Sequence, residues 1–141
     1  MQLREVMNTP VVTVRASSPT DEVAAVLVSN GFAAVPVVDD NGVLVGIVDE
    51  ADLVRSRVLP EGGQLDDLPV PHAGDVMTTP VLSSRPEDDV ADVAALMLDQ
   101  CVRAVAVVHE GRPIGIITRR DVLRAVAQRR LGDERIRAHR W

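Results

Sequence analysis

Two short stretches of the sequence place a polar residue three positions before an aspartate. The heptad GIITRRD ends at Asp121, and the heptad GIVDEAD ends at Asp52. The polar residue is Thr118 in one copy and Asp49 in the other. A hydroxyl donor and a carboxylate one helical turn apart could bind the phosphate and the ribose hydroxyls of a nucleotide. These heptads are therefore the first candidates for a binding site.

Thr118 follows an apolar run and precedes a helical pattern, so we expect it where a strand turns into a helix. Free N–H groups and the positive end of the helix dipole favour a phosphate there. Gly115 would let a ligand approach the backbone closely. The alternative is that Thr118 caps the helix and Asp121 is its capping-box partner. A carboxylate turned toward the cap is turned away from a ribose, so the two roles compete.

The heptads belong to a longer internal repeat, which is the strongest fold signal in the chain. The spacing between the copies is constant, apart from one residue lost where the turn DDNG becomes HEG. Three segments recur in order: Val6–Val14 as Val76–Ser84, Glu22–Val38 as Asp92–Val108, and Leu44–Arg55 as Pro113–Arg124.

Each half predicts the order β-α-β-β-α. We expect a first helix with Ser18 as its cap and Pro19 as its first residue, ending at Gly31 in the left-handed conformation. Apolar runs on both sides of Asn41-Gly42 predict a hairpin, and a second helix follows from about Asp49. The second half repeats this order, with a helix from Asp89, a strand from Ala104, a turn at Glu110-Gly111 and a helix from Thr118.

The predicted fold class is α+β. Neither half buries enough surface alone, so the two repeats should pack sheet against sheet with approximate two-fold symmetry. We place the first repeat at residues 1–58 and the second at 76–131. A linker rich in Pro, Gly and Asp is expected at 59–75, and an Arg-rich tail at 132–141.

The composition argues against several other classes of protein. A net charge of −6 does not favour a general nucleic-acid binder. Eight of the 15 basic residues, all arginines, lie between Arg119 and Arg140, where a solvated helix face and tail are expected. We expect Cys101 to be a small buried filler without a disulfide partner. With no signal peptide and no membrane-length apolar run, we expect a cytoplasmic protein.

The chain carries no clear catalytic or metal-binding pattern. HExxH, CxxC and nucleophile-elbow motifs do not occur. The histidines, His72, His109 and His139, fall in the expected linker, turn and tail. We therefore expect a protein that is not an enzyme and needs no cofactor.

Taken in order, the repeated motifs resemble a tandem cystathionine-β-synthase (CBS) domain pair, or Bateman module. VMNTPVVTV and VMTTPVLSS open the halves, and GFAAVPVVDDNGVLVGIV and CVRAVAVVHEGRPIGII form the hairpins. The resemblance extends from Val6 to about Val126. It implies a stand-alone regulatory module that binds AMP, ADP, ATP or S-adenosylmethionine in clefts between the repeats, and that pairs into a homodimer.

The resemblance also implies roles for individual residues. Asp121 would take the ribose hydroxyls, and Thr118 would contact phosphate. Arg103 would point toward the phosphates, with Arg119 and Arg120 screening their charge, although surface roles stay open for all three. An aliphatic wall for the base, or alternatively ordinary core, is expected from Val11, Val12, Thr13, Ile116 and Val107.

The first copy departs from the pattern at Asp49. A carboxylate is a good cap but repels phosphate, and Glu50 adds a second negative charge. Asp52 could still bind a ribose, so a neutral or cationic adenosyl ligand would suffer less. We expect a degenerate site that is empty, weak or differently selective, formed by Asp49, Asp52, Ile47, Val81 and Leu82.

Two other functions compete with the ligand sensor. A scaffold without a ligand would dock on a partner through its Arg-rich end, AQRRLGDERIRAHRW, with Trp141 as an anchor. The same basic end could bind nucleic acid weakly.

Overall fold

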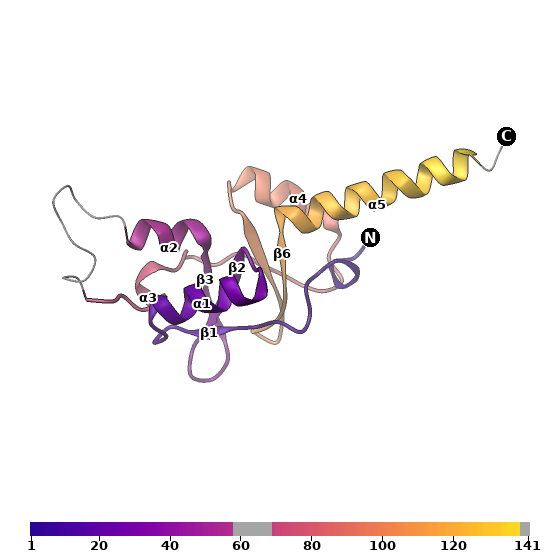
Figure 1. Cartoon of the computed structure of the whole chain (residues 1–141). Helices are drawn as coiled ribbons and strands as arrows, with labels where there is room; N and C mark the ends of the chain where they lie inside the picture. Colours follow the sequence, from indigo (N-terminus) through magenta and orange to yellow (C-terminus); the bar gives the residue numbers. More distant parts are fainter. Residues whose placement is uncertain (58–68, 139–141) are drawn as a thin grey trace.

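The elements of the chain repeat in the predicted order (Figure 1). The computed structural model describes residues 1–57 and 69–138, with side chains described as far as residue 128. The first half contains η1 (Leu3–Glu5), β1 (Val14–Arg15), α1 (Thr20–Asn30), β2 (Ala34–Val38), β3 (Leu44–Asp49) and α2 (Glu50–Ser56). The second half contains α3 (Ala73–Val76), β4 (Ser83–Ser84), α4 (Val90–Asp99), β5 (Ala104–His109), β6 (Arg112–Thr118) and α5 (Arg119–Ala138).

Each half forms a three-stranded sheet, in the order β1-β2-β3 or β4-β5-β6. The first pair of strands in each sheet is parallel, and the second pair is an antiparallel hairpin. Gly42 has a φ of 80° in the first hairpin turn, and Glu110 and Gly111 have φ of 52° and 78° in the second. Both predicted hairpins are confirmed.

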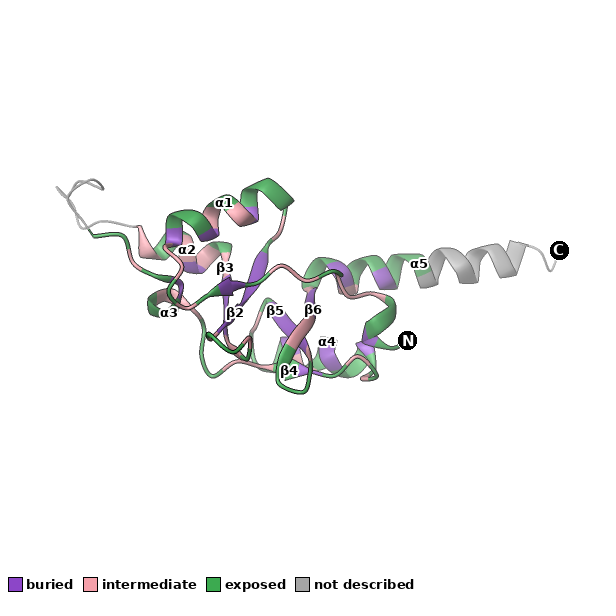
Figure 2. Cartoon of the chain, turned by 90° about the horizontal axis from the view of Figure 1, so that it is seen from below, coloured by how far each residue is buried: buried purple, intermediate pink, exposed green. Residues whose placement is uncertain are grey.

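The two sheets pack against each other through small and aliphatic side chains. Ala34 and Ile47 of the first sheet share one buried cluster with Ala104, Ala106 and Ile116 of the second. The buried residues gather on these strands and on the inner sides of the helices (Figure 2). The predicted α+β class and sheet-to-sheet packing are therefore confirmed.

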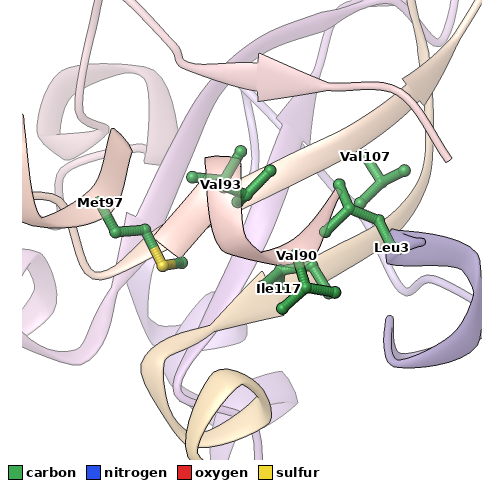
Figure 3. Packing of buried hydrophobic residues seen from close by; sticks show 7 residues of the cluster. Leu3, Val90, Val93, Met97, Val107 and Ile117 are labelled. Atoms are coloured by element: carbon green, nitrogen blue, oxygen red, sulfur yellow. The ribbon is translucent and has the colours of Figure 1, made fainter. Parts of the chain in front are cut away.

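Each half begins with an entry segment, around Leu3 or around Ala73, that packs into the core of the other half. Leu3, at the start of the chain, is 0% exposed and packs with Val93 and Ile117 of the second half (Figure 3). Its backbone N–H donates to the carbonyl oxygen of Asp88 at 2.9 Å. In the same way, Ala73 lies in the core of the first half. The repeats are thus interlocked at their entry segments, which the sequence analysis did not predict.

The start of α1 differs from the prediction. Pro19 is the N-cap, with ψ of 144°, and the helix begins at Thr20. The Ser18 hydroxyl oxygen accepts from the N–H of Arg15 instead of capping the helix. The N–H of Thr20 donates to the carbonyl oxygen of Pro71, so contact with the other half fixes this corner. The left-handed cap at Gly31, with φ of 66°, is confirmed.

Helix α5 extends well past the body of the second half (Figure 1). It continues to Ala138, beyond the boundary expected at residue 131. The expected docking residue Trp141 and most of the expected linker lie outside the described residues. In the described part of the chain, no helix combines the length and apolar character needed to cross a membrane.

Candidate functional site

The corner between β6 and α5 holds Asp121 in a defined orientation. Its side chain is 3% exposed. The Oδ2 atom accepts from the Thr118 N–H at 2.8 Å, from the Thr118 hydroxyl at 2.9 Å and from Asn8 Nδ2 at 2.9 Å. Among the described residues, the Oδ1 atom accepts only from Arg124 Nη1, at 3.4 Å. Thus Oδ2 serves the protein, while Oδ1 has acceptor capacity left for a ligand.

This geometry resolves the two roles foreseen for Asp121. The carboxylate does bond the N-terminus of α5, as a capping-box residue would. It uses one oxygen for that purpose, so capping does not exclude a ligand on the other. The Thr118 hydroxyl hydrogen is directed to Asp121 Oδ2. To donate to a phosphate, Thr118 must exchange this partner.

The equivalent corner in the first half is closed more tightly. Asp49 and Asp52 form a complete capping box, in which each side chain accepts from the other residue's N–H. Arg55 Nη2 lies 2.6 Å from Asp52 Oδ1, and the Thr78 hydroxyl lies within 3.4 Å of both carboxylate oxygens. Asp52 Oδ1 therefore has a shorter ion-pair contact than Asp121 Oδ1 and a second contact, to Thr78. Helix α2 also has only seven residues, against twenty in α5.

A cleft of about 470 Å³ opens at the Asp121 corner. This volume falls within the range of roughly 300–1,000 Å³ that is common for small-molecule sites. The cleft carries four arginines against two carboxylates, Asp121 and Glu50. It therefore has the net positive charge that an anionic ligand needs. Of the predicted residues, the cleft brings together Arg103, Ile116, Thr118, Arg119, Arg120 and Asp121.

The pocket at Asp52 is much smaller, about 150 Å³. Two arginines, Arg55 and Arg103, balance the carboxylates of Asp49 and Asp52 there. Small volume and balanced charge both disfavour a phosphate-bearing ligand. The predicted residues that line this pocket are Ile47, Asp49, Asp52, Val81 and Leu82.

Arg103 has a different partner from the one expected. Its Nη1 atom lies 3.5 Å from Asp49 Oδ2, so it pairs with the first half. The same side chain lines both the large cleft and the small pocket. The prediction placed it only at the Asp121 site.

Several other predicted residues do not line the cleft. Val11, Val12 and Thr13 are absent from its lining, and Val107 is fully buried in the core of the second half. Gly115 makes room for a side chain rather than a ligand, because a Cβ there would lie 2.8 Å from Met7 Sδ. The segment before β1 forms an isolated antiparallel bridge to β6, between Asn8 and Ile116.

The lining also includes residues that were not predicted for this site, among them Asn8, Phe32 and Arg124. Asn8 is the counterpart of Thr78, and both contact the heptad aspartate of the other half. The repeat of VMNTP as VMTTP could be recognised in the sequence. The residues that these segments contact could not be predicted from it. Phe32 follows the helix-capping Gly31 and brings the one phenylalanine of the chain to the cleft. The cleft lining therefore contains an aromatic ring, whereas an aliphatic wall was expected for the base.

Cys101 also differs from the prediction. It is exposed, has φ of 54° and lines the small pocket instead of filling the core. The cause is its place in the turn after α4, where the equivalent residue is the left-handed Gly31. Among the residues that the structure describes, no group of three or more His, Cys, Asp or Glu side chains is placed to hold a metal ion.

Comparisons with known proteins agree with the fold. The family model described as CBS domain matches residues 3–58 and again residues 73–128. The chain is similar to the CBS domain of a CBS domain-containing membrane protein from Sphaerobacter thermophilus. That structure is 36% identical with a TM-score of 0.74, and the match covers 88% of this chain and 86% of that one.

A second similar structure is CBSX2 in complex with AMP, at 31% identity and a TM-score of 0.74. The match covers 92% of this chain and 98% of that one. CBSX2 is a chloroplastic protein of Arabidopsis thaliana. An uncharacterized protein of Methanocaldococcus jannaschii is 29% identical over 86% of this chain. The chain spans 41% of the length of that relative and 33% of a second one from the same organism.

Proposed function

Because the chain belongs to the CBS domain family, we propose that it is a regulatory module that binds an adenosine-containing ligand in the cleft at Asp121. The observation that carries the proposal is the arrangement of this corner. A carboxylate whose Oδ1 atom has a single long contact, to Arg124 at 3.4 Å, lies beside a long helix N-terminus and four arginines. CBSX2, whose crystallised chain is 98% covered by the match, was crystallised with AMP.

The cleft offers a complementary group for each part of AMP. Asp121 Oδ1 would accept from a ribose hydroxyl. The N-terminus of α5, with Arg119 and Arg120, would hold the phosphate. Phe32 and Ile116 would contact the adenine, with the aromatic ring as a stacking face. Binding, rather than turnover, is the proposed role.

The Asp121 cleft is proposed as the principal site, and the Asp52 pocket as a degenerate one. A ligand that binds only the folded state raises the melting temperature by mass action. We expect a rise with AMP, ADP or ATP, and a smaller rise with S-adenosylmethionine, which lacks phosphate. The test is a thermal-shift screen of these ligands at millimolar concentration, repeated with Asp121→Ala. No shift with any ligand would overturn the proposal.

We also propose that the module is a homodimer. Large apolar side chains lie exposed at equivalent positions of the two halves, with Val28 83% exposed on α1 and Leu98 76% exposed on α4. Val54 on α2 and Leu123 on α5 form a second equivalent pair. Exposed apolar patches often mark interfaces, and pseudo-symmetric faces suit a two-fold partner of the same kind. A second copy of the chain is therefore the proposed occupant.

A further inference from the structure

Arg103 lies between the two cavities and is shared by them. It lines the 470 Å³ cleft at Asp121 and the 150 Å³ pocket at Asp52. Its guanidinium pairs with Asp49 across the interface of the two halves, with 3.5 Å between Nη1 and Oδ2. The Asp49 side chain is 19% exposed and that of Arg103 is 52% exposed, so the pair is partly shielded from solvent.

The repeat gives this arginine no counterpart. The equivalent position in the first half is Ala33, which also lines the large cleft. The partner of the pair also differs between the two halves. The position of Asp49 carries the hydroxyl of Thr118 in the other half. The Arg103 cation and the Asp49 carboxylate therefore form a pair that the equivalent positions, Ala33 and Thr118, cannot form.

We propose that Asp49 competes with the ligand phosphate for Arg103, and so sets the affinity of the Asp121 cleft for anionic adenosine ligands. The inference rests on the proposed function. A phosphate in the cleft gains the Arg103 guanidinium only by drawing it from Asp49. Part of the binding free energy is then spent on breaking the ion pair. Asp49 acts through Arg103 and is a positioning residue.

The consequence is specific to the phosphate. In the Asp121 cleft, a ligand without phosphate does not need Arg103, so Asp49 does not affect its affinity there. Asp49→Asn removes the charge but keeps a good N-cap for α2. Because partly exposed ion pairs contribute modestly, we expect this variant to bind AMP about two- to fivefold more tightly. Arg103→Gln should bind AMP about tenfold more weakly, since it loses a charge-assisted hydrogen bond.

The experiment is isothermal titration calorimetry of the full chain with AMP and with adenosine. The variants are Asp49→Asn, Arg103→Gln and the double variant. Asp40→Asn is the matched control, because it removes the same charge from a side chain that is 92% exposed and pairs with Arg15. The inference predicts tighter AMP binding only for Asp49→Asn. It also predicts unchanged adenosine binding, and no effect of Asp49→Asn when Arg103 is already Gln.

Three results would overturn the competition. One is AMP affinity in Asp49→Asn equal to that in Asp40→Asn. Another is an equal gain for adenosine, and the third is a gain that persists in the double variant. If Asp49→Asn does not fold, Asp49→Ser keeps the cap and carries the same predictions. Wild-type protein that binds neither probe would overturn the proposed function itself, and the competition with it.

Discussion

Leu3→Ala should destabilise the second half, although Leu3 lies at the start of the first. The side chain is 0% exposed in the core shared with Val93 and Ile117. The truncation removes three carbon atoms, each worth about 0.8 kcal/mol on burial, and leaves a cavity that adds to the loss. We expect a loss of about 3 kcal/mol in the free energy of unfolding, or about 10 °C in Tm for a chain of this length.

The assay is urea unfolding followed by circular dichroism, with hydrogen exchange to locate the change. Exchange should rise in β5 and β6 before β2 and β3, because Leu3 packs only on the second core. Val126→Ala, at a side chain that is 57% exposed on α5, is the control and should shift stability by less than about 0.5 kcal/mol. A loss in Leu3→Ala no greater than in this control, or one confined to the first half, would refute the interlocked arrangement.

Three further predictions concern the cleft, the packing and the assembly. Phe32→Ala should weaken AMP binding by about 1–3 kcal/mol, the usual contribution of base–aromatic stacking; an unchanged Kd in calorimetry would contradict this role. Gly115→Ala should cost about 1–3 kcal/mol through overpacking against Met7, and Met7→Ala should recover part of it in chemical denaturation; the absence of any loss would show that the close contact is not limiting. We expect the wild type to be dimeric in light scattering and the double variant Val28→Glu, Leu98→Glu to be monomeric; a dimer that persists in the variant would contradict this interface.

The fold was predictable because the chain repeats itself. Alternating apolar runs, the Asn41-Gly42 turn and the left-handed Gly31 are local signals, and the structure confirms each of them. The entry segments were not predictable in the same way. Leu3 and Ala73 complete cores of the opposite halves, and no local propensity records which half a segment joins. Pro19 shows the same limit, since contacts with residues 71–74 override a good capping sequence.

The site was predictable at its heptads and less so around them. The spacing of Thr118 and Asp121 predicted both at one helix corner. The substitution at Asp49 predicted a degenerate first site, and this stays a prediction. The ion pair between Arg103 and Asp49 depends on how the two halves face each other. The contact between Asn8 and Asp121 depends on it too. Such contacts are set by tertiary packing, which the order of residues alone does not specify.

The central claim is that one of two equivalent corners is competent to bind a phosphorylated adenosine ligand. It is tested most directly by calorimetric titration of AMP into the wild type, Asp121→Asn and Asp52→Asn. Both substitutions keep a side-chain oxygen for the helix end, so they differ only in which corner loses its charge. We predict one AMP per chain, a loss of at least about tenfold in affinity for Asp121→Asn, and unchanged affinity for Asp52→Asn. Two AMP molecules per chain, or an equal loss from Asp52→Asn, would contradict the account.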